Sequence, residues 1–216
     1  MIVSRPSTPS RPFRLWAAAL CLALALPGMG CVKSAPTSFY LLDSGQPPPA
    51  TGPLPGRTLR LGAVTVPEYL DRRDMVLRHA RDARLEVAGL HQWAEPLAKG
   101  VHRVLREVLA PRLAGSGYSL LPDGDAGEEA PALLVDLLRL DGDFQDGSCL
   151  TARWQLRDAL GGVVAQGVFS DVQPGGPDFA ALARDQGLLV RRLGVHLADQ
   201  LDAALPGLSR GDRGRR

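Results

Sequence analysis

The sequence predicts a mixed α/β (α+β) domain, a two-layer sandwich in which a mostly antiparallel or mixed sheet packs against two long amphipathic helices. Short runs in which apolar and polar residues alternate are typical of strands, and they occur in two groups along the chain. Each group is followed by a long stretch with apolar residues three and four positions apart, which is typical of a helix with one buried face. This order of elements favours helices packed on one sheet.

The first group contains four expected strands, which are residues 39–42, 58–66, 75–79 and 84–88. The alternation in the second strand predicts buried positions at Leu59, Leu61, Ala63 and either Val64 or Val66. Pro67 ends that strand, and a turn over residues 69–74 leads to the third. A short charged turn joins the third strand to the fourth, which predicts a hairpin.

The first helix is expected over residues 93–113, because Pro96 suits a first helical turn and one apolar stripe follows it. The stripe consists of Leu97, Val101, Val104, Leu105, Val108 and Leu109. Pro111 and Gly115 mark the expected end of this helix.

The second group of strands begins with residues 133–140, a nearly continuous apolar run that is typical of a strand buried on both faces. A turn over residues 141–147 leads to a strand at 149–156. A further turn at 158–162 leads to a strand at 163–169, so the three strands are expected to form an antiparallel meander.

The second helix is expected over residues 178–205, with Asp178 as its N-cap and Pro206-Gly207 at its end. Its buried face is expected to hold Phe179, Leu182, Leu189, Leu193, Leu197 and Leu201.

Residues 1–30 predict a signal peptide, because a basic start without acids precedes an apolar run of about twelve residues, where a spanning helix needs roughly twenty. Gly30 comes directly before Cys31. The stretch resembles the lipobox of bacterial lipoproteins, in which this cysteine receives lipid and becomes the new N-terminus. We therefore expect Cys31 to be lipidated, although Gly28 stands where Leu is usual. The alternative is a plain signal peptide with an incidental cysteine.

The remaining chain is expected to form a lipidated tether over residues 31–38 and a single domain over residues 39–207. A Pro-rich loop over residues 45–56 belongs to this domain, and a disordered basic tail follows over residues 208–216. The formal net charge is +2, but arginines of the signal and the tail supply the excess. The body is mildly acidic, which argues against nucleic acid as a partner.

No pattern in the sequence predicts catalysis, a metal or a cofactor. Neither a phosphate-binding GxxxxGK[ST] loop nor a GxSxG nucleophile motif is present, and the four histidines are scattered. Asp141, Asp143 and Asp146 do not have the spacing of a calcium-binding loop, and an acidic hairpin turn explains them. Cys149 is the one thiol expected after processing and acylation, so no internal disulfide is predicted.

Three stretches are conspicuous in a chain with few aromatic residues: residues 67–72 (PEYLDR), residues 93–97 (WAEPL) and residues 152–154 (ARW). Trp154 lies on an alternating strand and is expected in the core. Tyr and Leu are unusual in a turn and can mark a contact surface, although turn structure also explains them. The residues that we predict to contact a partner are Tyr69, Leu70, Asp71, Arg72, Trp93 and Glu95.

These stretches, in this order after a lipobox, resemble the ABC-type transport auxiliary lipoproteins, the PqiC-like family. The strand that contains Phe39 and Tyr40 also fits the family pattern, whereas Arg73 and Asp74 stand where Pro-Gln is common.

The resemblance implies a non-enzymatic lipoprotein in the outer membrane, held by palmitate-type acyl chains and facing the periplasm. It would belong to a mammalian-cell-entry (MCE) system that moves phospholipid or other hydrophobic molecules between two membranes. Its partners would be a tube-forming MCE subunit and, through self-association, further copies of the chain. Val32, where an inner-membrane retention signal has Asp, favours the outer membrane. One alternative is a lipoprotein that binds a lipid itself, and the other is an envelope hydrolase.

Overall fold

The computed structural model describes residues 34–43, 45, 56–79, 84–122 and 130–211, with side chains up to residue 206. The expected signal peptide, Cys31, most of the Pro-rich loop and residues 212–216 lie outside this part of the chain. The elements described below belong to the unit Thr37–Arg216. These elements are β1 (Ser38–Tyr40), β2 (Arg57–Thr65), the 3-10 turn η2 (Glu68–Leu70), β3 (Asp74–Arg78), β4 (Leu85–Trp93), α2 (Leu97–Gly115), β5 (Tyr118–Leu120), β6 (Ala132–Asp143), β7 (Gly147–Arg157), β8 (Val163–Gln173) and α3 (Phe179–Gly211).

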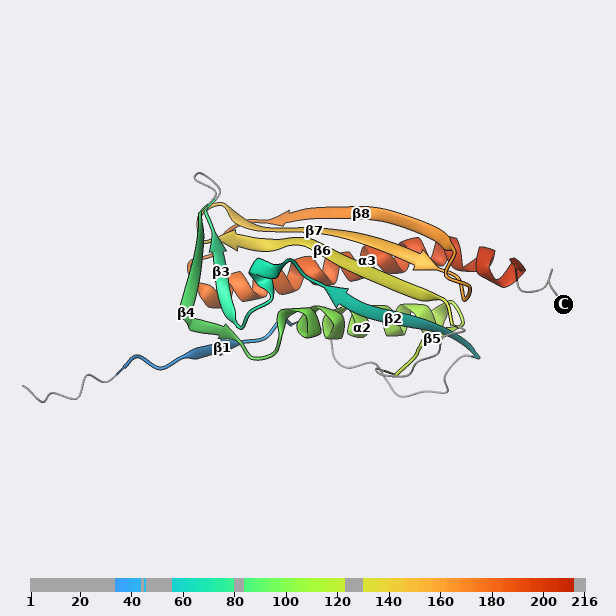
Figure 1. Ribbon diagram of the computed structural model, residues 1–216, viewed down its shortest axis with the longest axis horizontal. Coiled ribbons are helices and arrows are strands. Elements are labelled where there is room, and N and C mark those ends of the chain that lie inside the picture. The colour runs from blue at the N-terminus through green and yellow to red at the C-terminus, as the bar shows by residue number, and fades with distance from the viewer. Residues whose placement is uncertain (1–33, 44, 46–55, 80–83, 123–129, 212–216) are drawn as a thin grey trace, which may run out of the picture. The chain divides into compact units, whose positions relative to one another are not determined.

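The eight strands of the described residues form one open, mixed sheet around β6 (Figure 1). On one side, β6 pairs antiparallel with β7 along its length, and β7 pairs antiparallel with β8, so the predicted meander is confirmed. On the other side, β6 pairs in parallel with two strands in succession, first β2 and then β3. The predicted hairpin of β3 and β4 is also confirmed, and β1 extends the sheet beyond β4.

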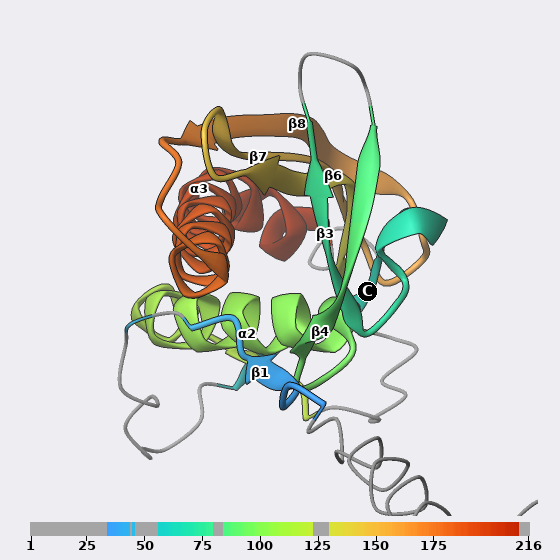
Figure 2. The ribbon, with the colours of Figure 1, turned by 90° about the vertical axis from the view of Figure 1, so that its left-hand side faces the viewer.

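The helices α2 and α3 lie against each other on the inner face of the sheet, which curves around them (Figure 2). The predicted apolar stripes form the core, in which only Phe179 is partly exposed. Gly194 of α3 allows a close approach, because a Cβ atom there would lie 2.9 Å from Cγ1 of Val108 on α2. The mixed α+β class with two helices on one sheet is confirmed, while the two-layer description of this curved arrangement stays a prediction.

Several predicted helix boundaries are wrong. Trp93 is the last residue of β4, and α2 begins at Leu97, because Pro96 precedes the helix as its N-cap. Of the two residues expected to mark the end of α2, Gly115 is its last residue, whereas Pro111 lies inside the helix; Pro206 does not end α3, which continues to Gly211. The fixed φ of proline is itself helical, so each proline removes one backbone hydrogen bond that packing of the helix can offset. The Asp178 cap is confirmed, because its carboxylate accepts the N–H of Ala181 at 2.8 Å.

Two predictions about strands also need correction. The register of β2 against β6 shifts between Leu61 and Val64, so Ala63 is exposed and Val64 is buried. A bulge adds one residue and exchanges the faces of all later side chains, which simple alternation cannot anticipate. Asp141 and Asp143 belong to β6 rather than to a turn, and the turn begins only at Phe144. The short strand β5 was not predicted.

Candidate functional site

The turn that the sequence singles out lies where the chain passes from β2 to β3. Both strands pair with the same side of β6, so the turn occupies the interval between Thr65, which pairs with Asp136, and Leu77, which pairs with Gly142. Within η2, the N–H of Leu70 donates to the carbonyl of Pro67 at 2.9 Å, and the Leu70 side chain is only 4% exposed. A buried leucine therefore fixes the position of the turn on the domain.

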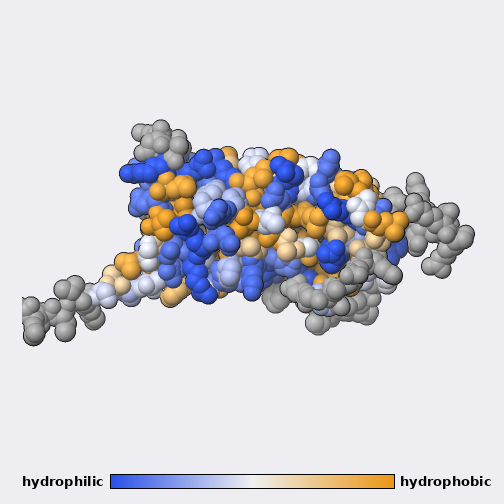
Figure 3. Space-filling model, in the orientation of Figure 1, coloured by the Kyte–Doolittle hydropathy of each residue, from blue (hydrophilic) through white to orange (hydrophobic). Residues whose placement is uncertain are grey.

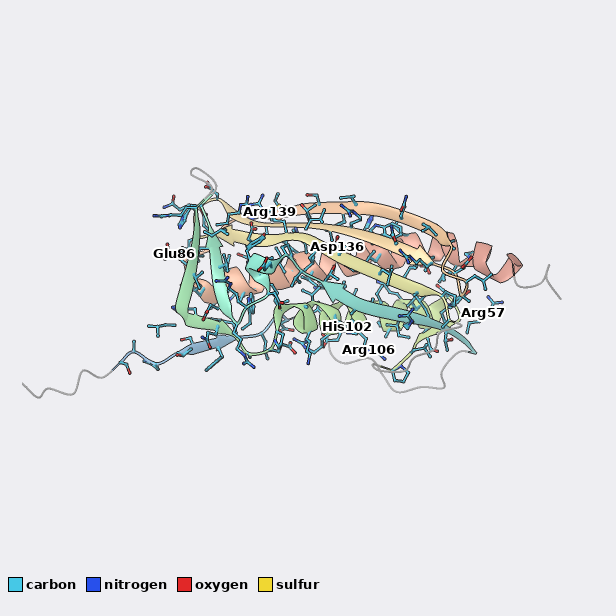
Figure 4. The ribbon with its side chains drawn as sticks, viewed as in Figure 1. Arg57, Glu86, His102, Arg106, Asp136 and Arg139 are labelled. Atoms are coloured by element: carbon cyan, nitrogen blue, oxygen red, sulfur yellow. The ribbon has the colours of Figure 1, made fainter. Side chains whose placement is uncertain are left out.

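A second anchor of the turn is the buried carboxylate of Asp141 on β6, which has no exposed surface. The hydroxyl of Tyr69 donates to its Oδ2 atom at 2.5 Å, and Nε of Arg139 donates to its Oδ1 atom at 2.6 Å. The guanidinium of Arg78 on β3 lies 3.4 Å from Oδ2. A buried carboxylate needs such partners to offset its lost hydration. We call Tyr69, Arg78, Arg139 and Asp141 the Asp141 cluster; Figure 4 labels Arg139 on β6.

The pKa values of two members of the Asp141 cluster, Tyr69 and Arg139, are raised. Burial raises the pKa of the Tyr69 phenol well above its usual value, and the hydrogen bond and negative charge of Asp141 raise it further. Burial alone would lower the pKa of Arg139, but the hydrogen bond and charge of Asp141 outweigh this effect and raise it. Tyr69 therefore remains a hydrogen-bond donor at neutral pH and does not act there as a base or a nucleophile. This chemistry suits an anchor for the turn.

The second conspicuous stretch joins the end of β4 to α2. Trp93 is 5% exposed and belongs to the core. Oε1 of Glu95 accepts hydrogen bonds from Nε and Nη2 of Arg103 on α2, at 3.0 and 2.8 Å. Arg103 also donates to Glu107 at 3.0 Å and to the carbonyl of Leu42 at 2.7 Å. The guanidinium of Arg103 thus ties α2 to the segment after β1, and Glu95 holds it in place.

The structure brings the second conspicuous stretch next to Arg73, the residue that follows the first, and next to β1. The N–H of Trp93 donates to the carbonyl of Arg73 at 2.7 Å, and the N–H of Ala94 donates to the carbonyl of Tyr40 at 2.8 Å. The third stretch does not join them, because Trp154 is buried on β7 and its ring stands edge-on to that of His196 on α3, with ring centroids 6.4 Å apart. The expected core position of Trp154 is confirmed.

The six residues predicted to contact a partner divide into buried, partly buried and exposed ones. Leu70 and Trp93 are buried, so they do not form part of the free surface. Tyr69 and Glu95 are half-buried and bonded to Asp141 and Arg103. Asp71 and Arg72 are exposed. The partner contact stays a prediction, and among the six predicted residues Asp71 and Arg72 are the ones on this turn with exposed side chains.

Sequence reasoning did not find the residues that hold these stretches. Asp141 is predicted to lie in an acidic hairpin turn, although an acid at the end of an apolar run, two residues after Arg139, is a signal of a buried ion pair. The sequence does not distinguish Arg103 from other polar residues, because it lies on the polar face of an ordinary amphipathic helix. Its partners Glu95 and Leu42 are brought to it only by the tertiary fold.

In the described part of the chain, no group of three or more His, Cys, Asp or Glu side chains is placed to hold a metal ion. Among the same residues, no helix has the length and apolar character needed to cross a membrane. The free thiol of Cys149 is partly exposed on β7.

Comparison with solved structures defines the class of fold. The crystal structure of an uncharacterized protein matches with a TM-score of 0.64 at 20% identity, over 77% of this chain and 99% of the other. The crystal structure of protein XCC0632 from Xanthomonas campestris, assigned to the family model DUF330, matches with a TM-score of 0.63 at 15% identity, over 82% of this chain and 99% of the other. The chain thus has the mixed α+β fold of these proteins. A search of curated proteins finds no match.

The model of the ABC-type transport auxiliary lipoprotein component family matches residues 40–198. The chain belongs to this family, as the conspicuous stretches indicated. It is an auxiliary component of an ABC-type transport system, with a transporter as its partner, and the family is one of lipoproteins rather than enzymes. Membership indicates a membrane-anchored place in the cell envelope.

Proposed function

We propose that this chain is a non-enzymatic outer-membrane lipoprotein that docks a tube-forming MCE subunit, in a system that transports phospholipid or other hydrophobic molecules between the membranes. The observation that carries the proposal is the family match over residues 40–198. The expected acylation of Cys31 supports a membrane anchor, and Val32 at the next position supports the outer membrane with the domain facing the periplasm.

We place the docking contact on the exposed end of the turn between β2 and β3. Leu70 in the core and the bond from Tyr69 to Asp141 hold this turn, so Asp71 and Arg72 project from a fixed backbone. A fixed surface loses little conformational entropy when a partner binds. Asp71 and Arg72 carry opposite charges. Exposed charges of this kind orient a partner and contribute less to the affinity of binding.

Co-purification tests the docking contact. The full-length chain, extracted with the MCE subunit in mild detergent, should lose most of that subunit when it carries Asp71→Lys and Arg72→Glu together. Arg112→Glu is a matched control, since Arg112 is an exposed arginine on α2 whose partner Asp199 is also exposed. Equal recovery of the MCE subunit with the double variant and the control would place the contact elsewhere.

The same preparation addresses the alternative that the chain binds a lipid itself. The helices α2 and α3 are in contact, and the leucines between them and the sheet are fully buried, which favours docking over carrying a ligand. A lipid extract of the purified full-length protein, freed from its partner, should contain its own acyl chains and no stoichiometric lipid. One bound lipid per chain would support the alternative.

A further inference from the structure

The outer strand β8 presents an edge with little protection. Within the described residues, β8 pairs with β7 alone. Natural edge strands usually carry a lysine, a proline or a bulge that prevents pairing with another chain. None of these occurs between Gln166 and Ser170, and Val168 is 62% exposed. Figure 3 shows apolar atoms among hydrophilic ones along the upper border of the domain, where β8 runs.

The ladder between β7 and β8 indicates which backbone groups face the open side. The side chains of Thr151 and Ser170 lie 3.1 Å apart, and those of Gln155 and Gln166 lie 3.2 Å apart. Such close pairs are typical of the positions in an antiparallel ladder that do not exchange backbone hydrogen bonds. At these positions the backbone points away from β7. Gln166, Val168 and Ser170 therefore direct their N–H and C=O groups to the open edge.

One end of this edge is closed. Val172 has the same orientation, but Oδ1 of Asp171 accepts its N–H at 2.8 Å. Arg192 of α3 approaches the carbonyl of Val172 at 3.5 Å and bonds to the side chains of Asp171 and Gln173. The edge is thus closed at Val172, and the open part before it includes Gln166, Val168 and Ser170.

The exposed side chains of this segment are self-complementary. Along one face of β8, valine alternates with a small or amide polar residue at Val164, Gln166, Val168, Ser170 and Val172. If a second β8 lies antiparallel and centred on Val168, valine meets valine at the centre, and Gln166 meets Ser170 on either side of it. Pairs of β-branched residues across two strands stabilise a sheet, and no like charges meet on this face.

We propose that two copies of this chain associate by antiparallel pairing of their β8 edges about Val168, which continues the sheet from one copy into the other. Pairing over so short a segment buries less than the roughly 1,200 Å² of a stable complex, so the dimer is weak in dilute solution. Anchoring in one membrane raises the local concentration and promotes it. The inference does not depend on the identity of the transporter.

Cysteine cross-linking of the full-length chain in its membrane tests this pairing, in a Cys149→Ala background. Val168→Cys should give a dimer with a short thiol cross-linker, because paired Cα atoms lie about 5.5 Å apart at such a position. Arg153→Cys, on the same face but one strand further in, should not, since about three strand spacings of 4.8 Å would separate the two copies. We expect at least about a tenfold difference in dimer yield, a free-energy difference of about 1.4 kcal/mol if the yield follows the population.

The register is tested independently by mixing. Gln166→Cys and Ser170→Cys should cross-link efficiently to each other when coexpressed, and poorly when each is expressed alone. The proposal is overturned if Val168→Cys gives no more dimer than Arg153→Cys. It is also overturned if the cross-linked product has the mass of another protein bound to this chain. The second result would mean that the edge receives a strand from a partner instead of a second copy.

Discussion

The hydroxyl of Tyr69 lies 2.5 Å from Oδ2 of Asp141, a residue 72 positions further along the chain, and this contact joins the turn after β2 to the centre of the sheet. Tyr69→Phe keeps the ring and removes the donor. We expect the free energy of unfolding to fall by about 1.5–3 kcal/mol, the usual range for a hydrogen bond to a charged group. Denaturant unfolding measures this change. Asp71→Asn on the same turn is the control, with an expected change within about 0.5 kcal/mol.

The raised pKa of Tyr69 predicts a dependence of stability on alkaline pH. Its pKa in the folded chain exceeds the unfolded value of 10.0, because burial and Asp141 disfavour the phenolate. Its contribution is therefore fully present below pH 10 and is lost as the pH rises above 10, where the unfolded chain releases the proton first. The stability advantage of the parent over Tyr69→Phe should shrink between about pH 10 and 11.5, by up to about 1.4 kcal/mol per unit. A constant advantage over this range contradicts the assignment.

The fork of hydrogen bonds from Arg103 predicts local rather than global effects. Arg103→Lys retains the charge but cannot contact Glu95, Glu107 and the Leu42 carbonyl at once. We expect amide hydrogen exchange of residues 38–42 and of Ala94 to accelerate about tenfold, because β1 then opens more readily. Exchange in β6 and β7 should stay unchanged. Arg112→Lys, which disturbs an exposed pair, should leave β1 as it is in the parent.

The sequence predicts correctly the elements in which apolar residues recur at a regular spacing. The leucines and valines of α2 and α3 recur every three or four residues, and the structure buries them as predicted. The meander from β6 to β8 followed from consecutive strands with short turns. These features depend on neighbours in the chain, which a single sequence displays directly.

Features that depend on distant residues could not be predicted in this way. Nothing near Arg57–Thr65 indicates that β2 and β3 share one side of β6, and this arrangement is what creates the space for Tyr69 and Leu70. The residues singled out as partner contacts were unusual for their local context. The structure supplies the reason for Leu70 and Trp93 in the core, and leaves Asp71 and Arg72 to be tested.

Gly194 predicts how tightly α2 and α3 pack. Gly194→Ala places a methyl group 2.9 Å from Cγ1 of Val108, so one of the helices has to shift. We expect a loss of about 1–2 kcal/mol from overpacking, after the better helix propensity of alanine is included. Thermal unfolding measures the loss. Val108→Ala should cost less in the Gly194→Ala background than alone, because it removes the clashing methyl group; strictly additive costs argue against direct contact.

The expected membrane anchor at Cys31 can be tested by substitution. If Cys31 is acylated, Cys31→Ser should move the exported chain from the membrane to the soluble fraction, because each buried methylene of an acyl chain contributes about 0.8 kcal/mol to membrane binding. Cys149→Ser, which changes the other cysteine expected in the mature chain, should leave the distribution unchanged. Gly28→Leu restores the usual residue of the lipobox and should reduce the unprocessed fraction seen by mass spectrometry of the N-terminus. If Cys31→Ser is instead cleaved and remains in the membrane like the parent, the cysteine is incidental, and the proposed placement of the domain at the outer membrane loses its physical basis.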